Sequence, residues 1–458
     1  MNRHLDYESA MNYLHGLYRF GSRLGLGRIR RLTSLLGNPE RRFPSVHVAG
    51  TNGKGSVTAM VANVLRESGY RVGMYISPFL QDFEERMSIN GENIPRERVA
   101  ELASRSTATR ARVAVERMLE EGHEHPTEFE VITAMAFQYF AEEGVDFGVI
   151  EVGLGGRYDA TNVVTPWVSV ITSIGFDHMD RLGNTIAKIA YEKAGIIKSG
   201  VPVVSSRQPA EALAVISQAA QENGSRLVRV GEDVEWREVR CSIEGQSVHL
   251  RGLHGSYENL DIALLGRHQQ GNAATAVAAL EVLSSAGVRV PEHAVRRGLA
   301  TVKWPGRLEV ISRSPLIVID GAHNQDGARV LAAAIRDILP HDRMVLVIGI
   351  LADKALDDIL VELVPPAAHV IVTTPKSPRA YPADKLAEKV REYPVTVHVK
   401  PRISDALEKG LELTGPSDLL CVTGSLYLVG DARSKLGGFF QPDMNIHTSG
   451  LQPGGSRP

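Results

Sequence analysis

The stretch VHVAGTNGKGSVTAM, residues 46–60, constrains the fold more than any other part of the sequence. It joins a short apolar run, residues 46–49, through a Gly-rich turn to an amphipathic helical pattern over residues 56–68, and a second apolar run follows at residues 71–76. A strand, a helix and a strand in this order form a βαβ unit, in which the two strands are parallel. The sequence therefore predicts an α/β domain built on a mostly parallel sheet.

Further short apolar runs extend this prediction along the chain. VDFGVIEVG (residues 145–153) and PWVSVITSIG (residues 166–175) contain runs that are typical of buried parallel strands. Between about residues 226 and 265, alternating segments such as RLVRV and SVHLRGL are separated by glycine, which predicts a small antiparallel insertion. The helical pattern then returns at GRHQQGNAATAVAALEVL.

A Trp-Pro-Gly cluster in VKWPGRLEV, residues 302–310, interrupts the pattern, and a new alternation of strands and helices follows it. We therefore expect a first domain over residues 1–305 and a smaller Rossmann-like α/β domain over residues 306–440. A chain of 458 residues is long enough for both to bury a core. The last residues, 441–458, are polar and rich in glycine and proline, which predicts a disordered tail.

The overall charge argues against a polyanionic partner. Lys and Arg total 51 against 53 Asp and Glu, so no positive excess favours nucleic acid or an anionic membrane surface, and a small-molecule partner is expected. The two cysteines, Cys241 and Cys421, lack metal-ligand spacing and suit a reducing cytoplasm. No signal peptide and no apolar run of about 18 residues is present, so we expect a cytoplasmic protein, and in the absence of a dimerisation element a monomer.

The Gly-rich turn has the parts of a phosphate-binding loop. Its glycines are Gly50, Gly53 and Gly55. Glycines let backbone N–H groups converge on phosphate oxygens at a helix N-terminus, while Lys54 supplies a cation and Ser56 a hydroxyl for Mg²⁺. The spacing departs from the common loop, which has glycine where this chain has Val48 and a hydroxyl residue where it has Gly55. The alternative is a Gly-rich turn that binds no ligand.

Two polar residues follow other apolar strands. Glu151 comes directly after residues 147–150, at the carboxyl end of a parallel strand, where ligands bind in such sheets. His178 follows the next strand and precedes a helix that carries Lys193. The simpler alternatives are a solvated or capping carboxylate and a hydrogen-bonded loop histidine, and periodicity alone does not distinguish Lys193 from the other lysines.

Several blocks occur in the order and spacing of folylpolyglutamate synthase/dihydrofolate synthase, a family of the Mur ligase superfamily. They are FPSVHVAGTNGKGS, ISPFLQDFEERMSING, EVGLGGRYDATN, ITSIGFDHMDRLGNTIAKIAYEKAGIIK, GRHQQGNAATAVAAL, WPGRLE, DGAHN and VTGSLYLVGDAR. The resemblance runs from about residue 8 to 435 and includes the unusual loop GTNGKGS. It implies an ATP-dependent amide ligase that forms an acyl phosphate on a dihydropteroate or reduced-folate carboxylate, couples it to L-glutamate, and releases ADP and phosphate.

The resemblance also implies roles for individual residues. It implies catalytic roles for Lys54, His178 and Lys193, with Lys193 carbamylated and holding a second Mg²⁺; the alternative is an unmodified lysine in a salt bridge. The implied Mg²⁺ ligands are Ser56, Ser77, Glu151, His178 and the carbamate of Lys193. The implied ATP contacts are Thr51, Asn52, Gly53, Lys54, Gly55, Ser56, Asn272, Arg307, Asp320 and His323.

For the pterin end of the acceptor, the resemblance points to Phe129 in TEFE and to Asp159 and Ala160 in RYDATN. A core phenylalanine and an ordinary polar loop are equally acceptable explanations. Three rival functions stay open: a ligase acting on a UDP-muramyl precursor, a monofunctional folate ligase, and a nucleotide-binding switch without ligase chemistry. The muramyl ligases carry a UDP-binding domain before the loop, whereas 53 residues precede Lys54 here.

Overall fold

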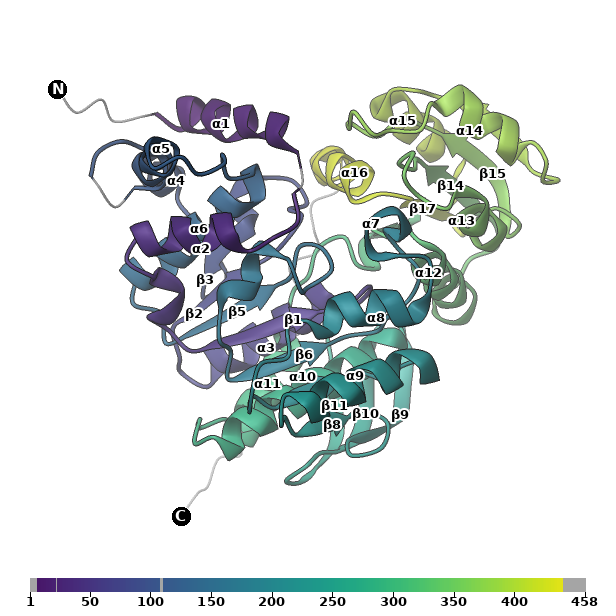
Figure 1. The fold of residues 1–458 in the computed structure, drawn as a ribbon. Coiled ribbons are helices and arrows are strands. Elements are labelled where there is room, and N and C mark those ends of the chain that lie inside the picture. The colour runs from purple at the N-terminus through teal and green to yellow at the C-terminus, as the bar shows by residue number, and fades with distance from the viewer. Residues whose placement is uncertain (1–5, 22, 108–109, 440–458) are drawn as a thin grey trace, which may run out of the picture. The chain divides into compact units, whose positions relative to one another are not determined.

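The computed structural model describes residues 6–21, 23–107 and 110–439. It divides into two compact units, Met1–Pro305 and Gly306–Pro458, which are described separately below (Figure 1). The tail predicted over residues 441–458 lies outside the described residues.

The first unit is built on a mostly parallel eight-stranded sheet. In spatial order its strands are β4 (Glu92–Asn93), β3 (Met87–Ile89), β2 (Val72–Tyr75), β5 (Phe147–Glu151), β1 (Ser45–Ala49), β6 (Val168–Ile171), β7 (Val203–Ser205) and β8 (Leu227–Arg229). Strands β2, β5, β1, β6, β7 and β8 are parallel, and β3 pairs antiparallel with both β2 and β4. This arrangement confirms the predicted fold class, because the apolar runs form buried neighbouring strands.

Side chains alternate between the two faces of this sheet and build separate cores. Val46 and Val48 of β1 pack into the core that holds α3 (Lys54–Glu67), α10 (His268–Ser285) and α11 (Glu292–Thr301). Ile150 and Ala49 belong to the cores of the opposite face. The α-helices of those cores are α1 (Tyr7–Gly16), α2 (Gly27–Leu35), α4 (Arg96–Leu102), α5 (Ala111–Glu120), α6 (Glu128–Glu142), α7 (Met179–Leu182), α8 (Ile186–Ala194) and α9 (Ala210–Glu222).

The predicted antiparallel insertion is present but shorter than expected. It consists of β9 (Glu235–Ser242), β10 (Gly245–Arg251) and β11 (Ser256–Ile262) in the order β11-β10-β9. Assigning RLVRV to this insertion was wrong, because β8 pairs in parallel with β7 and its Val228 is buried in the core of the main sheet. A short alternating strand fits either sheet, and only its partner decides between them.

The second unit contains a six-stranded sheet of the predicted smaller α/β type. In spatial order its strands are β12 (Glu309–Arg313), β13 (Leu316–Asp320), β17 (Leu419–Thr423), β14 (Met344–Ile348), β15 (Ala367–Val372) and β16 (Thr396–Val399). Only β12 is antiparallel to its neighbour, and every residue of β13, β17 and β14 is buried. The helices are α12 (Gln325–Ile338), α13 (Leu356–Leu363), α14 (Ala383–Val390), α15 (Ile403–Leu413) and α16 (Leu426–Phe439).

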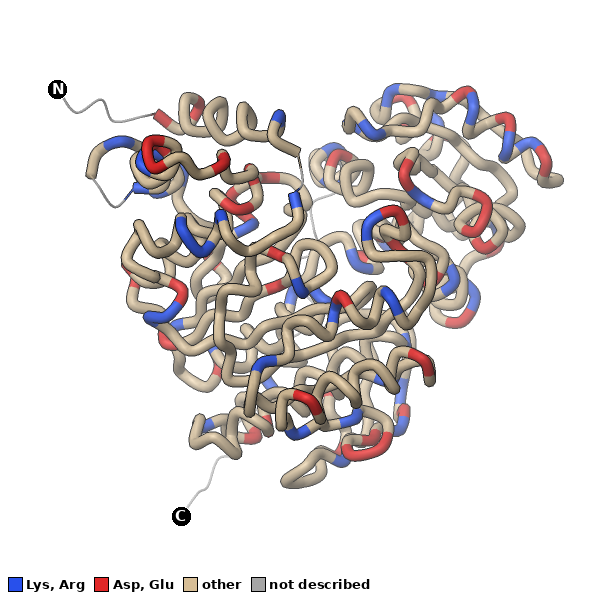
Figure 2. The backbone as a smooth tube through the Cα atoms, in the orientation of Figure 1, with Lys and Arg blue, Asp and Glu red and all other residues tan. Residues whose placement is uncertain are grey.

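Acidic and basic residues are interspersed within both units (Figure 2). Across the part of the chain that the structure describes, no helix is long and apolar enough to cross a membrane.

Candidate active site

Four neighbouring strands of the first unit, β2, β5, β1 and β6, run in parallel and therefore end at the same edge of the sheet (Figure 1). Residues predicted for phosphate, metal and substrate binding follow these strands directly. Ser77 lies just beyond β2, Glu151 ends β5, the Gly-rich loop follows β1, and His178 lies beyond β6. Because loops after parallel strands meet at one edge, the topology brings these residues to one place.

The Gly-rich loop is held at the end of β6 by several hydrogen bonds. The backbone N–H groups of Thr51 and Asn52 donate to the Ser173 carbonyl oxygen at 2.9 and 3.2 Å. The Thr51 hydroxyl lies 3.1 Å from both the carbonyl oxygen and the amide nitrogen of Gly175. Thr51 therefore fixes the loop, in addition to any contact that it makes with a nucleotide.

Glycine is required at two positions of this loop. Gly53 has a φ of 87°, and a Cβ there would lie 2.5 Å from Oδ1 of Asn272 on α10. Gly50 has a φ of 151°, and a Cβ there would lie 1.8 Å from the Thr172 hydroxyl. Left-handed backbone and a lack of space both exclude larger residues, so the loop can follow a path that ordinary side chains would block.

The loop leads directly into α3, whose first residues are Lys54, Gly55 and Ser56. The Lys54 ammonium donates to the Thr51 carbonyl oxygen at 3.0 Å, so its positive charge lies over the loop. The buried Ser56 hydroxyl accepts a hydrogen bond from Nε2 of Gln269 at 3.2 Å. A helix N-terminus with a lysine at its first residue attracts anions.

Helix α10 connects the predicted Asn272 to this loop. Asn272 donates through Nδ2 to Oε1 of Gln269 at 2.9 Å, and Gln269 in turn contacts Ser56. Gln269 is fully buried and was not predicted as a site residue, although it belongs to the recognised HQQGN block. This chain of amides positions the loop from the side of the helix.

Glu151 and Ser77 form an oxygen-rich pair at the ends of β5 and β2. The Ser77 amide donates to Oε2 of Glu151 at 3.3 Å, and Glu151 is only 6% exposed. The Ser77 hydroxyl oxygen is buried and has no hydrogen-bond partner among the described residues. Hard cations such as Mg²⁺ prefer oxygen ligands, so a buried hydroxyl oxygen beside a carboxylate fits such an ion.

His178 lies in a strained turn that precedes α7. Its φ of 50° and ψ of 41° place it in the left-handed region, and Nε2 lies 3.9 Å from Oδ1 of the adjacent Asp177. Asp177 accepts a hydrogen bond from the His178 amide at 2.9 Å and was not predicted as a site residue. Backbone strain at an imidazole that follows a strand end is common at functional sites. The motif FDHMD contains both side chains.

Lys193 is a buried lysine whose amine contacts the phosphate loop. It is 4% exposed and donates through Nζ to the carbonyl oxygen of Gly50, the first glycine of the loop, at 2.7 Å. Burial and, secondarily, the positive charge of Lys54 lower the pKa of Lys193 to about 7, although Asp177 and Asp159 act in the opposite direction. A substantial fraction of this amine is therefore uncharged near neutral pH.

The burial of Lys193 agrees with helix periodicity once the structure shows which face of α8 is covered. On α8 the buried residues are Ile189, Ala190, Lys193 and Ala194. Lys193 lies four residues after Ile189 and therefore shares its face of the helix. A lysine in the apolar stripe of a helix indicates a functional group more strongly than its neighbours Lys188 and Lys198 do.

The residues predicted for the pterin end cluster around Gly153, just after β5. A Cβ at Gly153 would lie 2.5 Å from the Phe129 ring and 3.1 Å from Oδ2 of Asp159, and Ala160 is buried in the following turn. Asp159 accepts from the Leu154 amide at 2.8 Å and caps its own turn, and burial raises the pKa of its carboxyl group. The structure therefore brings Phe129 and Asp159 together. Asp159 also stabilises the loop through these hydrogen bonds.

Arg86 is a site candidate that the sequence did not reveal. Its Nε and Nη1 atoms are buried and have no hydrogen-bond partner among the described residues, and its guanidinium lies 5.3 Å from the centre of the Phe79 ring. Burial raises the pKa of Tyr75 and of Glu128, and the positive charge of Arg86 opposes this rise in both. Glu128 begins the same helix as Phe129. A buried guanidinium with unused donors is costly unless an anion binds to it.

The other predicted nucleotide contacts belong to the second unit. The carboxylate of Asp320, at the end of β13, accepts from the Leu308 amide at 2.7 Å and from the Ala322 amide at 2.8 Å. Burial raises the pKa of Asp320, while Arg307 lowers it. His323 donates through Nδ1 to the Gly321 carbonyl oxygen at 2.7 Å, which fixes the orientation of its ring. The three predicted contacts, Arg307, Asp320 and His323, therefore lie around the carboxyl end of β13.

No group of three or more His, Cys, Asp or Glu side chains capable of holding a metal occurs among the described residues. A Mg²⁺ ion does not need such a group, because it is commonly bound by one or two carboxylates together with phosphate oxygens and water. The buried Ser77 hydroxyl beside Glu151 fits this requirement.

Comparison with known proteins agrees with the resemblance seen in the sequence. The Mur ligase middle domain matches residues 48–280, and the Mur ligase, glutamate ligase domain matches residues 306–426. The Bacillus subtilis dihydrofolate synthase/folylpolyglutamate synthase is 37% identical over 432 residues, which cover 94% of this chain and 99% of that protein.

Two solved structures have similar folds and similar coverage. The Mycobacterium tuberculosis folylpolyglutamate synthase complexed with ADP has a TM-score of 0.87 and 35% identity, over 94% of this chain and 99% of that chain. E. coli FolC in complex with DHPP and ADP has a TM-score of 0.84 and 30% identity, over 94% and 98%. These relatives favour the folate branch over the ligases that act on UDP-muramyl precursors. The chain therefore belongs to the folylpolyglutamate synthase/dihydrofolate synthase family of the Mur ligase superfamily, an enzyme family of ATP-dependent glutamate ligases.

Proposed function

We propose that this enzyme joins L-glutamate both to dihydropteroate and to reduced folates. The observation that carries the proposal is the convergence of the phosphate loop, the Glu151–Ser77 pair and the buried Lys193 at one edge of the sheet. The double name of the Bacillus subtilis relative supports two activities in one chain. Residues 1–305 form the ATP-binding domain, and residues 306–440 form the C-terminal ligase domain.

The reaction proceeds in two steps at a carboxylate. One carboxylate oxygen attacks the γ-phosphorus of ATP, which breaks the bond to ADP and gives an acyl phosphate. The uncharged amine of L-glutamate then attacks the carbonyl carbon, phosphate leaves, and an amide forms with loss of the amine proton. Both steps bring anions together, so the protein must supply positive charge and dipoles around them.

The phosphate loop supplies much of this charge. The backbone N–H groups from Asn52 to Ser56 and the N-terminus of α3 face the phosphates, and Lys54 binds their outer oxygens. Asn272 contacts the nucleotide from α10, beside Gly53. In the second domain Arg307, Asp320 and His323 contact ATP.

We assign the Mg²⁺ ligands to Ser77, Glu151 and His178, with Ser56 close to the ion and the phosphates. When bound, Mg²⁺ neutralises charge that develops on the phosphate oxygens. Asp177 holds the His178 turn through its hydrogen bond to the His178 amide.

Lys193 carries a carbamate in the working enzyme and holds a second Mg²⁺ through its oxygens. Only an uncharged amine reacts with CO₂, and the lowered pKa of Lys193 makes that form available near neutral pH. The resulting carbamate is an anion, and Lys54 lies close enough to affect the charge at this position.

The acceptor binds beside Gly153 and Phe79. Phe129 stacks on the pterin ring, and Asp159 and Ala160 form the loop at its edge. Arg86 binds a carboxylate of the acceptor, because its buried Nε and Nη1 groups have no other partner among the described residues.

We further propose that the enzyme is a cytoplasmic monomer. The sequence contains only two cysteines, far apart and without metal-ligand spacing, which suits a reducing compartment. Light scattering of the purified protein measures the mass in solution, and a dimer mass would contradict the proposal.

The proposed reaction predicts ADP formation from MgATP and L-glutamate with either 7,8-dihydropteroate or tetrahydrofolate. Each product gains the mass of one glutamyl residue, because one amide forms for each ATP used. Coupled detection of ADP and mass spectrometry of the products measure both quantities. Turnover with one acceptor alone would refute bifunctionality, and nucleotide hydrolysis that needs neither acceptor nor glutamate would indicate a nucleotide switch.

Replacing Glu151 or His178, two of the proposed metal ligands, should abolish ligation but preserve the fold. We expect Glu151→Ala and His178→Ala to lower kcat/KM at least about a hundredfold, because each removes a group that fixes charge next to the phosphates. Glu258→Ala and His249→Ala are matched controls, since this pair lies on the small antiparallel sheet. Thermal unfolding of all four variants is the second measurement. A loss of stability as large as the loss of activity would contradict the assignment.

Carbamylation of Lys193 should be visible directly. With ¹³C-bicarbonate, the enzyme should show a carbamate carbonyl NMR signal that is absent from Lys193→Ala and present in Lys198→Ala. Lys198 is a suitable control because burial also lowers its pKa, to about 8. Lys193→Ala should lose ligation, and added bicarbonate should not restore it. A signal that survives in Lys193→Ala would show that another amine is modified.

Arg86→Gln should weaken acceptor binding. We expect its KM for the acceptor to rise at least about tenfold, because a charge-assisted hydrogen bond to the carboxylate is lost. The KM for ATP should change little. Arg86→Lys should raise the KM for the acceptor less than Arg86→Gln does, because it keeps the positive charge. The control is Arg96→Gln, since Arg96 is largely exposed and pairs with Glu84. An unchanged KM for the acceptor in Arg86→Gln would assign this guanidinium a structural role.

A further inference from the structure

The first unit contains a cavity that the ligation chemistry does not use. Its volume is about 410 Å³, within the range of small-molecule sites, roughly 300–1,000 Å³. Its wall includes Arg41, Thr165 and Lys198, which lead into the amino ends of β1, β6 and β7. The phosphate loop follows the carboxyl end of β1, so the cavity and the loop belong to opposite ends of the sheet.

The cavity carries a net positive charge. Its charged residues are Arg30, Arg41 and Lys198 against Glu40, a formal sum of three positive charges and one negative charge. Arg41 lies 3.4 Å from Oε1 of Glu40, whereas Arg30 and Lys198 form no ion pair with a carboxylate among the described residues. Burial, and then the charge of Arg30, lower the pKa of Lys198 to about 8. Two cations that repel each other in this way favour an anion between them.

The same cavity also carries buried acceptors that lack donors. Glu40 and Asn162 are each 4% exposed, and Oε2 of Glu40 and Oδ1 of Asn162 have no hydrogen-bond partner among the described residues. The amide of Asn162 donates through Nδ2 to the Arg157 and Gly195 carbonyl oxygens, which fixes its orientation. Buried acceptors of this kind need an N–H or O–H group from a ligand or from water.

We propose that this cavity binds a dicarboxylic α-amino acid. The carboxylates of the ligand lie on Arg30 and Lys198, and its ammonium group donates to Glu40 and Asn162. A molecule that combines carboxylates with N–H donors satisfies both the cations and the buried acceptors of the lining, and the net charge of −1 of a dicarboxylic amino acid is opposite to the charge of the cavity. The proposal does not depend on the ligation reaction, because it concerns binding at a different end of the sheet.

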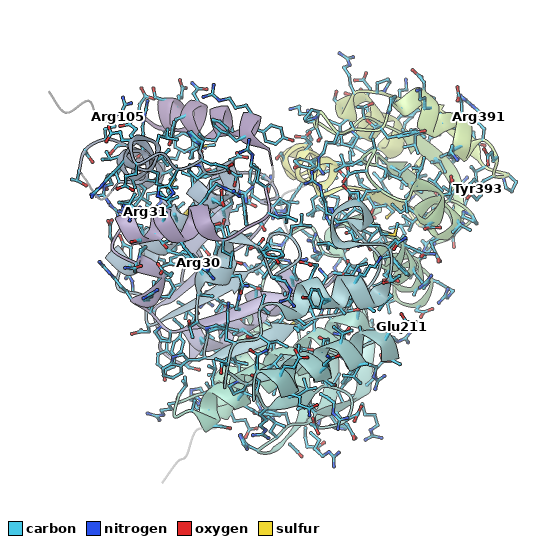
Figure 3. All side chains as sticks on the ribbon, viewed as in Figure 1. Arg30, Arg31, Arg105, Glu211, Arg391 and Tyr393 are labelled. Atoms are coloured by element: carbon cyan, nitrogen blue, oxygen red, sulfur yellow. The ribbon has the colours of Figure 1, made fainter. Side chains whose placement is uncertain are left out.

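Helix α2 offers a matched pair of variants. Arg30 and Arg31 are neighbours on this helix (Figure 3). Arg30 lines the cavity, whereas Arg31 donates two hydrogen bonds to Glu121. Arg30 is exposed, so Arg30→Gln should leave the fold intact, and thermal unfolding checks this.

The test is calorimetric titration of the full chain with L-glutamate, without ATP or acceptor. We expect Arg30→Gln to bind at least about tenfold more weakly than the wild type, through loss of a charge-assisted hydrogen bond, and Arg31→Gln to bind unchanged. Lys198→Gln should weaken binding in the same way. The KM for L-glutamate in ligation should stay within about twofold for Arg30→Gln, because catalysis uses the other end of the sheet. Unchanged affinity in both Arg30→Gln and Lys198→Gln would overturn the proposal.

Selectivity provides a second test. Glutarate, which lacks the ammonium group, should bind the wild type at least about tenfold more weakly than L-glutamate, and Glu40→Gln should remove this preference. Equal affinity for L-glutamate, glutarate and inorganic phosphate would overturn the amino-acid assignment, because it would indicate a site for simple anions.

Discussion

The attachment of the phosphate loop to the end of β6 is the constraint on which the site depends. Two backbone amides of the loop donate to the Ser173 carbonyl oxygen, and the Thr51 hydroxyl bonds to Gly175. These bonds fix the path of the loop before any ligand binds, so the N–H groups at the start of α3 need no large rearrangement to meet phosphate. The neighbouring strand ends then supply Glu151, Ser77 and His178 at the same edge.

Basic side chains are held close to the phosphate loop at this edge of the sheet. Lys54 donates to the Thr51 carbonyl oxygen and Lys193 to the Gly50 carbonyl oxygen, so two amines contact adjacent residues of one loop. Burial and mutual repulsion favour the neutral form of Lys193, which explains how a lysine is tolerated in the core. Arg86 adds a further buried positive group. An edge of this kind is prepared for substrates that bring several negative charges, as a nucleotide and a carboxylic acid do.

Much of the fold could be predicted because hydrophobic patterns are local. The apolar runs before the Gly-rich loop and before Glu151 became β1 and β5, and the alternation between residues 235 and 262 became the antiparallel insertion. RLVRV was assigned to the wrong sheet, because its alternation is the same in both and its partner β7 is distant in sequence. Strand pairing is a property of the whole fold, and short strands carry little information about it.

The sequence by itself determined the family, the strand-loop-helix predicted at residues 46–68 and the order of the recognised motifs, since each depends on residues close together in the chain. Only the tertiary structure decided which side chains are buried and unpaired. It placed Lys193 against Gly50 and Gln269 against Ser56, and it left Nε and Nη1 of Arg86 without a hydrogen-bond partner among the described residues. The physical reason is that desolvation and hydrogen bonding depend on neighbours that are far apart in sequence.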